Sequence, residues 1–386
     1  MKNIQLFVPT FDIDECLKEI RECLEKGWTG LGYKTIEFEN QWKEYTGLPH
    51  AHYLNSNTIG LQLAVKIFKE ENKWSDGDEI ISTPLTFVST NHAILYEGLK
   101  PVFADVDDSL CLDPDSVLHR ITPKTRAVMY VGMGGNTGRL NDIADICRSK
   151  KLKFILDAAH MAGTRFNGKH IGYNADCTIF SYQAVKNLPS ADSGMICFTD
   201  GELDKIVRMY SWLGINKDTY ARTTGMNKGE YKWYYDVSYV GLKAHGNSVI
   251  ASLCIAQLKH LDRDNARRRE ISALYDSRFQ NNPSIRLIRM ATGCESSRHL
   301  YQIAVDQILR DPLISYLNEK NIFPGVHYRT NTDYKMYSYA KGTCPKAEKY
   351  STEIISLPLH MKLTDDEVNY VADQVIEYMS KNNTGA

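Results

Sequence analysis

Residues 177–199, CTIFSYQAVKNLPSADSGMICFT, contain two short apolar runs separated by a polar loop. Both runs are rich in β-branched and aromatic residues, which predicts two buried strands, and Pro189, Ser190 and Gly194 mark the loop between them. Lys186 therefore lies just beyond the end of the first strand. A single lysine is most often an exposed surface residue, so the rest of the chain must show whether this amine has a chemical role.

The neighbouring segments repeat a pattern of apolar strand and amphipathic helix. The strand-like runs are DEIIST (78–83), PVFADV (101–106), RAVMYVG (126–132) and KFILDAAH (153–160), and the helix-like runs are VSTNHAILYEG (88–98), LNDIADICRSK (140–150) and ELDKIVRMYSWLG (202–214). Short unbroken apolar strands between amphipathic helices are typical of a mostly parallel sheet that is covered on both faces. The sequence therefore predicts an α/β fold.

The pattern changes after about residue 245. A long helical stretch over residues 248–275 is followed by the shorter strands SIRLIRM and HLYQIAVD, and then by two further helices. This change predicts two domains, a large α/β domain over residues 1–247 and a smaller α+β domain over residues 248–386.

Two predicted helices begin with the pattern of a capping box, in which two residues three positions apart bond each other's backbone N–H groups. Asp12 and Glu15 mark the start of a helix that runs to Lys26. Thr364 and Glu367 mark the start of the last helix.

The bulk composition excludes several classes of protein. Lysine and arginine number 46 and aspartate and glutamate number 47, so the chain lacks the basic bias expected of a protein that binds nucleic acid or a membrane surface. No apolar run approaches the roughly 18 residues of a membrane span, and the first residues do not resemble a signal peptide. The nine cysteines are scattered without a C-x-x-C pair, so we expect reduced thiols, no metal site and a cytoplasmic protein.

Polar residues follow two of the predicted strands. Asp157 ends one strand and His160 lies three residues later, whereas Ser181 and Lys186 lie at and beyond the end of the next. In an open α/β sheet, ligands bind at the carboxyl ends of the strands. These four residues are therefore candidates for one site, although an aspartate here can also be a helix cap and a histidine can be a structural core residue.

A third candidate segment, LNSNT, places Asn57 and Thr58 at the N-terminus of a predicted helix. Such a terminus offers free backbone N–H groups and a positive dipole end to an anion, but NSNT is also an ordinary N-cap sequence. Phe87 in PLTFVST is a candidate ring-stacking residue that would otherwise be expected in the core.

Together these groups match the needs of pyridoxal 5′-phosphate. Lys186 can supply the amine that forms an imine with it, and Asp157 can keep the pyridine nitrogen protonated so that the ring withdraws electrons. The helix at Asn57 and Thr58 can bind the phosphate, and Ser181 can add a hydroxyl. The sequence has neither an early G-x-G-x-x-G motif nor a G-K-[ST] P-loop, which makes a dinucleotide- or nucleotide-binding protein the weaker interpretation.

Segments along nearly the whole chain resemble the DegT/DnrJ/EryC1/StrS family of sugar aminotransferases. The resemblance rests on the order and spacing of the segments VPTFDIDECLKEIRECLEKGWTGLGYKTIEFENQW, GDEIISTPLTFVST, GLKPVFADVD, ITPKTRAVMYV, ILDAAHMAGTRFNGKHIG, TIFSYQAVKNL and HLYQIAV. It implies a pyridoxal-phosphate-dependent enzyme with the aspartate-aminotransferase (type I) fold.

The resemblance also implies roles for individual residues. Lys186 matches the Schiff-base lysine, Asp157 the partner of the ring nitrogen, and His160 the residue that contacts the ring hydroxyl. The remaining cofactor contacts that it implies are Asn57, Thr58 and Ser181 at the phosphate and Phe87 against the ring.

Two further segments carry implied roles. Lys243 lies where the family has an asparagine or lysine that reaches the phosphate of the neighbouring subunit, which implies a homodimer with shared active sites. His327 and Tyr328 lie in the stretch that lines the sugar site in relatives. This chain departs from the family pattern where Asn57 replaces a glycine, where PSADSG replaces Gly-Glu-Gly-Gly, and where the residues after Tyr328 lose the usual proline and histidine.

The implied activity is the transfer of an amino group, from L-glutamate, to a keto-deoxysugar linked to a nucleotide. Lys186 favours transamination, because relatives that act as dehydratases have histidine at this position. Two alternatives stay open: an aminotransferase for a keto-cyclitol or other non-nucleotide sugar, and a regulator that binds pyridoxal phosphate without catalysis.

Overall fold

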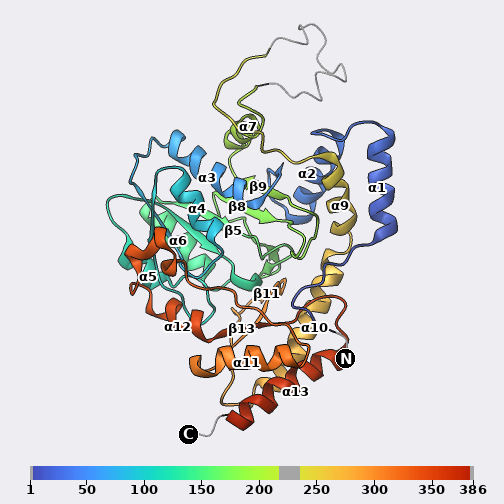
Figure 1. Ribbon diagram of the computed structural model, residues 1–386. Helices are drawn as coiled ribbons and strands as arrows, with labels where there is room; N and C mark the ends of the chain where they lie inside the picture. The colour runs from blue at the N-terminus through green and yellow to red at the C-terminus, as the bar shows by residue number, and fades with distance from the viewer. Residues whose placement is uncertain (1–2, 217–234, 383–386) are drawn as a thin grey trace.

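The computed structural model describes residues 3–216 and 235–382 (Figure 1). Within these residues the central layer is a seven-stranded sheet in the order β1–β9–β8–β5–β4–β2–β3. Its strands are β1 (His52–Leu54), β2 (Glu79–Ser82), β3 (Lys100–Phe103), β4 (Thr125–Val131), β5 (Lys153–Asp157), β8 (Cys177–Ser181) and β9 (Gly194–Phe198).

Most of this sheet is parallel, as the sequence predicts. The neighbours from β3 through β2, β4 and β5 to β8 all pair in parallel, whereas β9 is antiparallel to β8 and β1 is antiparallel to β9. The loop that contains Lys186 joins β8 to β9, and the chain returns beside the strand it has just left, which only an antiparallel pair allows without a crossover helix. The carboxyl ends of β5 and β8 consequently meet at one edge of the sheet.

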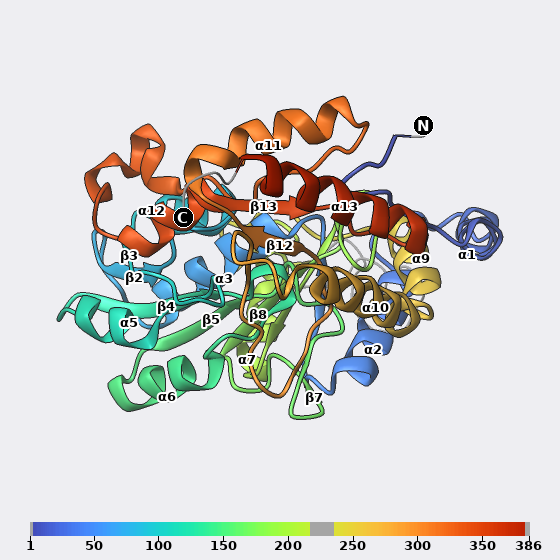
Figure 2. The same cartoon turned by 90° about the horizontal axis from the view of Figure 1, so that it is seen from below.

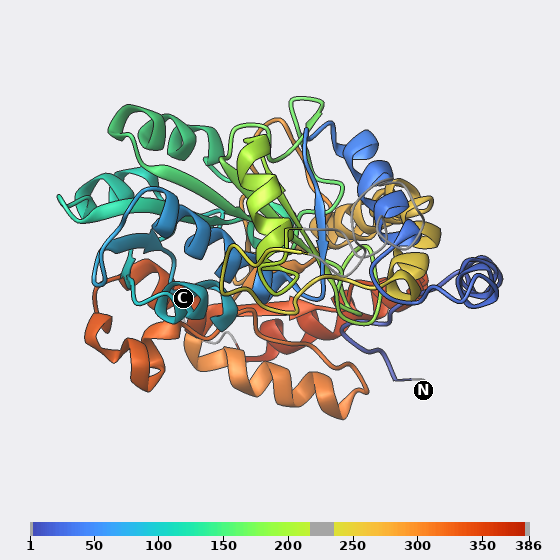
Figure 3. The same cartoon turned by 90° about the horizontal axis from the view of Figure 1, so that it is seen from above.

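Helices cover both faces of the sheet because its strands are apolar on both sides. In β4, Ala127 and Met129 belong to one core and Val128 and Tyr130 to the other, as the alternation of side chains along a strand requires. One core is closed by α3 (Asn57–Glu71), α4 (Val88–Tyr96) and α7 (Gly201–Tyr210), and the other by α2 (Tyr33–Thr46), α5 (Pro114–Arg120), α6 (Leu140–Lys150) and α9 (Ser248–Leu258). Figure 3 shows the yellow-green helix α7 lying across the near face of the sheet.

A second, three-stranded sheet forms the C-terminal part. Its strands are β10 (Arg286–Leu287), β12 (Tyr301–Ala304) and β13 (Ile354–Leu357), and it shares a core with α10 (Leu261–Phe279), α11 (Gln307–Glu319) and α13 (Asp365–Asn382). Figure 2 shows α11 and α13 side by side next to β12 and β13. The remaining α-helices and strands of the described residues are α1 (Ile13–Glu25), α12 (Pro345–Glu353) and the small sheet of β6 (Arg165–Phe166), β7 (Lys169–His170) and β11 (Cys294–Glu295).

The domain boundary at residue 247 stays a prediction. Beyond it, α9 packs against α1 and α2 of the large part. Before it, Ile4 pairs with Ile322 and belongs to the core of the small part. Among the described residues, no helix is both long enough and apolar enough to cross a membrane.

Several helical regions differ from the prediction. Helix α5 was not predicted, and three α-helices, α11, α12 and α13, follow β12 where two were expected. The stretch expected to be one helix over residues 248–275 is two, α9 and α10, which meet at Lys259 and His260. Helix α2 was not predicted, because polar residues such as Lys34 and Glu39 lie on its buried side and obscure the apolar period.

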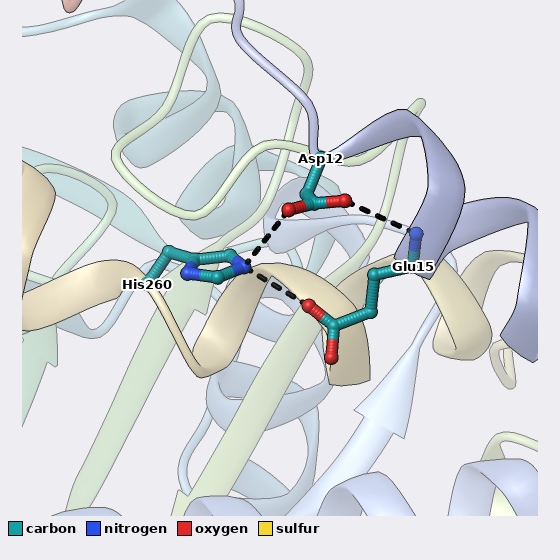
Figure 4. A group of neighbouring side chains, drawn as sticks. All are labelled: Asp12, Glu15 and His260. Carbon is teal, nitrogen blue, oxygen red and sulfur yellow. Dashed lines mark hydrogen bonds and ion pairs between the residues drawn. The ribbon is translucent and has the colours of Figure 1, made fainter.

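The predicted capping box of α1 is only half formed (Figure 4). The Asp12 carboxylate accepts a hydrogen bond from the Glu15 N–H at 3.1 Å, whereas the Asp12 N–H donates to Gln257 Oε1 at 3.2 Å. The Glu15 carboxylate lies instead 3.0 Å from His260 Nε2 and 2.5 Å from Lys259 Nζ. The N-terminal end of α1 is therefore linked by ionic contacts of Glu15 to the residues between α9 and α10.

The capping box of α13 forms completely. The Thr364 hydroxyl accepts from the Glu367 N–H at 3.1 Å, and the Glu367 carboxylate accepts from the Thr364 N–H at 3.0 Å. We predict that Thr364→Ala lowers the free energy of unfolding by about 1 kcal/mol, because a helix N-terminal donor loses its acceptor. Urea unfolding at fixed protein and cofactor concentration measures this loss. Ser315→Ala in α11 is the matched control, since the exposed Ser315 hydroxyl bonds only the Asp311 carbonyl of its own helix, and equal midpoints for the two variants would contradict the prediction.

Candidate active site

A cavity of about 430 Å³ opens at the carboxyl ends of β5 and β8. The predicted site residues that line it are Asn57, Thr58, Phe87, Asp157, His160, Ser181, Lys186, His327 and Tyr328. They come from both parts of the molecule, since His327 and Tyr328 follow α11. Lys243 is the predicted residue that lies elsewhere.

The Asp157 carboxylate is buried at the last position of β5. Its Oδ2 accepts from Thr90 Oγ1 at 2.8 Å, and its Oδ1 accepts from the Ala159 N–H at 3.2 Å and lies 3.4 Å from Asn57 Nδ2. Burial raises the pKa of Asp157 above its ordinary value, although these donors and Lys186 act in the opposite direction. A carboxylate in this environment gains from a cationic partner such as a protonated ring nitrogen.

The Lys186 amine lies in the loop that leaves β8 and faces the same cavity. Burial lowers the pKa of Lys186 to about 8, and the negative charge of Asp157 limits the fall. An amine with a pKa this close to neutrality can lose its proton readily. It is therefore suited both to nucleophilic attack on a carbonyl and to proton transfer.

His160 forms one wall of the cavity with Tyr328. His160 Nδ1 accepts from the Gly134 N–H at 3.2 Å, and burial, together with the positive charge of Lys186, holds the pKa of His160 well below its ordinary value. The ring is therefore neutral with its proton on Nε2, which lies 3.2 Å from the Tyr328 hydroxyl and donates to it.

His299 also lies at the site, although it was not predicted from the sequence. Its Nε2 lies 3.5 Å from Lys186 Nζ, its ring centroid lies 4.4 Å from that of His160, and its other face stacks on Phe7 at 5.5 Å. His299 begins the HLYQIAV segment just before β12, 113 positions from Lys186 in the chain. That segment contributed to the family resemblance, but no local pattern indicates that this histidine reaches the lysine.

The other end of the cavity suits an anion. Ser56 caps α3 by accepting from the Ile59 N–H at 3.3 Å, and Thr58 and Ser181 add hydroxyl groups beside the helix terminus. Among the described residues that line the cavity, Lys186 is the one lysine or arginine. The positive potential at this end therefore comes from the backbone N–H groups of α3.

Gly194 of β9 allows α3 to come this close to the sheet. A Cβ atom at position 194 would lie 2.6 Å from the Asn57 nitrogen and 2.8 Å from the Phe180 oxygen, both backbone atoms. The glycine is thus required by a close approach of two chain segments.

Phe87 lies at the mouth of the cavity and is not a core residue. Its side chain is 58% exposed, and its ring centroid lies 6.1 Å from that of Tyr328. A flat apolar face at the mouth, above the buried Thr90 and Asp157, suits the ring of a planar ligand.

Lys243 lies outside this cavity. It is exposed, and its Nζ lies 5.3 Å from the ring centroid of Trp212. It therefore does not line this cavity.

The groups in the cavity fit pyridoxal phosphate: a buried amine, a buried carboxylate, a helix terminus for a dianion and an aromatic face. On a mostly parallel sheet covered on both faces, they define an aspartate-aminotransferase-like enzyme of fold type I. The model of the DegT/DnrJ/EryC1/StrS aminotransferase family matches residues 11–376, and the chain belongs to this family.

Known relatives agree with this assignment. The chain is 34% identical over 371 residues to the spore coat polysaccharide biosynthesis protein SpsC of Bacillus subtilis. The matched residues cover 94% of this chain and 93% of SpsC. The fold of this chain is similar to that of PseC of Helicobacter pylori, an aminotransferase involved in the biosynthesis of pseudoaminic acid. The TM-score is 0.90 and the sequence identity 27%, and the superposition covers 98% of this chain and 100% of PseC. Spr1654 of Streptococcus pneumoniae in its PLP form gives a TM-score of 0.89 and 27% identity, with coverage of 98% and 99%.

These findings confirm the predicted fold, enzyme class and cofactor. The protein is an enzyme of a sugar aminotransferase family whose members depend on pyridoxal 5′-phosphate.

We predict that Gly194→Ala weakens pyridoxal phosphate binding and destabilises the protein by roughly 1–3 kcal/mol, because the new methyl group forces α3 away from β9. Titration of the cofactor-free protein with pyridoxal phosphate measures the affinity, and urea unfolding measures the stability. Gly30→Ala is the control, because a Cβ at Gly30 would have no heavy atom within 4 Å outside its chain neighbours. Wild-type affinity in Gly194→Ala would show that α3 does not need this close approach.

Proposed function

We propose that this enzyme transfers an amino group from L-glutamate to the keto group of a nucleotide-linked deoxysugar. The observation that carries the proposal is that Lys186 and Asp157 face one cavity, where the pKa of the Lys186 amine is lowered to about 8. The family and the relationship to SpsC and PseC support amino-sugar and polysaccharide biosynthesis as the setting.

The residues of the cavity divide into holding and reacting groups. We assign the phosphate to the N-terminus of α3 with Thr58 and Ser181, and the ring nitrogen to Asp157. Phe87 covers one ring face, and His160, fixed by Gly134 and Tyr328, lies beside the edge of the ring that bears the hydroxyl. Bound pyridoxal phosphate supplies the electron sink that acidifies the carbon next to the amino group.

Lys186 carries the chemistry that belongs to the protein. Its Nζ holds the cofactor covalently and becomes a free amine when the amino donor takes its place. Because its pKa is lowered to about 8, the free amine can take a proton from one carbon and return it to another without leaving the cavity. One site that serves donor and acceptor in turn predicts ping-pong kinetics.

The keto-sugar would enter past Phe87, where His327 and Tyr328 line the cavity. We assign these two residues to the sugar. A keto-cyclitol or other non-nucleotide sugar is the second candidate, since the residues after Tyr328 depart from the usual pattern. A regulator without catalysis is disfavoured by the intact lysine, aspartate and serine.

The test is a screen of keto-sugar nucleotides, keto-cyclitols and free keto-sugars with L-glutamate, read as release of 2-oxoglutarate. We expect turnover with a nucleotide-linked keto-deoxysugar and none in Lys186→Ala, which should still bind the cofactor. Borohydride reduction of the holoenzyme followed by peptide mapping should find the pyridoxyl group on Lys186. A pyridoxyl group on another lysine, or turnover of cyclitols alone, would contradict the proposal.

We also propose a cytoplasmic homodimer in which Lys243 reaches the phosphate of the partner's cofactor. A phosphate carries close to two negative charges, but a helix terminus supplies only about half a positive charge, and the described lining residues add no free cation besides Lys186. Val237, Val240 and Leu242, beside Lys243, are exposed apolar residues that a second subunit could cover. The nine cysteines are unpaired thiols, which suits a reducing compartment.

The exposed apolar face of α1 gives further support. Ile13, Leu17 and Leu24 recur at helical spacing but are 68%, 56% and 59% exposed, because the helix packs on α9 and buries Cys16 and Cys23 on a different side. Such a stripe on a single protomer is typical of a face that another chain covers.

We predict that Lys243→Ala weakens cofactor binding by about 1–3 kcal/mol, since a charge-assisted hydrogen bond is lost, and that the variant stays dimeric. Mixing Lys186→Ala protomers with Lys243→Ala protomers tests whether the lysine acts across the dimer. One site of each heterodimer would then be wild type and the other would carry both changes, so activity should recover toward half per heterodimer. No gain over the separate variants, with subunit exchange demonstrated, would place Lys243 outside the partner's site.

A further inference from the structure

His299 contacts the Lys186 amine and has no role in the function proposed above. Its Nε2 lies 3.5 Å from Lys186 Nζ, and its side chain is buried against His160 and Phe7. A histidine presents either an N–H donor or a lone pair at Nε2, depending on where its proton lies. The hydrogen bond at the other ring nitrogen decides between the two.

That hydrogen bond comes from Asn187, whose amide can be oriented in only one way. One end of the amide faces the Ser297 backbone carbonyl at 2.7 Å. A carbonyl only accepts hydrogen bonds, so this end is the NH₂ group. The Asn187 carbonyl oxygen is therefore the atom 3.0 Å from His299 Nδ1, and Nδ1 must carry the proton.

A second asparagine repeats the constraint. Asn265 Nδ2 donates to the Ala162 backbone carbonyl at 2.9 Å, so its carbonyl oxygen is the atom that accepts from Asn187 Nδ2 at 2.7 Å. Asn187, Asn265 and His299 are 6%, 1% and 2% exposed. The backbone carbonyls of Ser297 and Ala162 thus fix the donor and the acceptor in each hydrogen bond among Asn265, Asn187 and His299.

The electrostatic surroundings keep His299 neutral. Burial and the positive charges of Lys186 and Arg268, with His160 and His327 nearby, hold the pKa of His299 well below its ordinary value. Nε2 therefore offers a lone pair to the amine, and Asp157 is the acid that faces the same amine from β5.

We propose that Asn265, Asn187 and His299 form a one-directional hydrogen-bond chain that presents His299 Nε2 as a fixed acceptor to Lys186. Whenever Lys186 Nζ is not bonded to the cofactor, His299 would hold this amine in the cavity by accepting a hydrogen bond from it. His299 would not itself take up a proton from the amine. His299 thus touches the reacting amine, and the two asparagines are positioning residues. This inference rests on the proposed role of Lys186.

The position of the proton can be measured in the unaltered enzyme. Solid-state ¹⁵N NMR of holoenzyme labelled at histidine separates a protonated from an unprotonated ring nitrogen, and the His299 signals are those lost in His299→Phe. We expect a protonated Nδ1 and an unprotonated Nε2 from pH 6 to pH 9. A protonated Nε2 at any of these pH values would overturn the proposal.

The effect on Lys186 is measured in cofactor-free protein. Brief labelling with acetic anhydride between pH 6 and pH 10, with mass spectrometry of the Lys186 peptide, gives the pKa of this amine. Because an acceptor stabilises the ammonium form, its removal in His299→Phe should lower that pKa, so that labelling of Lys186 at pH 7 rises about five- to tenfold. Asn187→Leu should shift the pKa in the same direction, because the proton of His299 is then free to move to Nε2.

Phe7→Leu is the matched control, since it removes the ring stacked on His299 but leaves the hydrogen-bond chain intact, and the pKa of Lys186 should not change. A wild-type pKa in His299→Phe would mean that His299 only packs against the lysine. If Asn187→Leu does not fold, the NMR measurement decides. A pyridoxyl group on another lysine would instead refute the proposed function, and the proton position would stand as measured.

Discussion

The structure depends on burying an amine and a carboxylate at the meeting point of two neighbouring parallel strands. Lys186 and Asp157 follow β8 and β5, and their cavity is closed by both parts of the molecule. Burial disfavours the charged form of each group, raising the pKa of Asp157 and lowering that of Lys186. A cofactor with a basic ring nitrogen and a reactive carbonyl offers a partner to both groups, because the nitrogen can pair with the Asp157 carboxylate and the carbonyl can react with the Lys186 amine.

This constraint explains the polar residues packed around the pair. A buried polar group is costly unless it is hydrogen-bonded, and three residues around the pair have defined partners. Thr90 bonds Asp157, Gly134 bonds His160, and Asn187 bonds His299. Because each partner is a backbone group or a side chain with an assigned orientation, the hydrogens shared in these bonds are also placed.

Two features of the described chain support the proposed homodimer. The anion end of the cavity relies on a helix terminus, and the proposed second cation, Lys243, lies on an exposed segment beside apolar side chains. The apolar stripe of α1 is likewise exposed. In the proposed homodimer, a second copy of the chain would cover this apolar surface and add positive charge near the phosphate, so that assembly and cofactor binding would be coupled.

The sequence alone determined the α/β architecture and the strand-end residues at the centre of the cavity, because both are encoded locally. Apolar strands, helix caps and strand-end polar residues can be recognised within a few positions, and so Asp157, Ser181, Lys186 and the start of α3 were all predicted. Helix α2 was missed because its buried side includes Lys34 and Glu39, whose partners lie elsewhere in the chain. His299, Asn265 and Gly194 were assigned by the tertiary structure alone. Their roles depend on contacts between segments far apart in sequence, and the direction of a hydrogen bond or the space for a Cβ atom exists only once those segments have packed together.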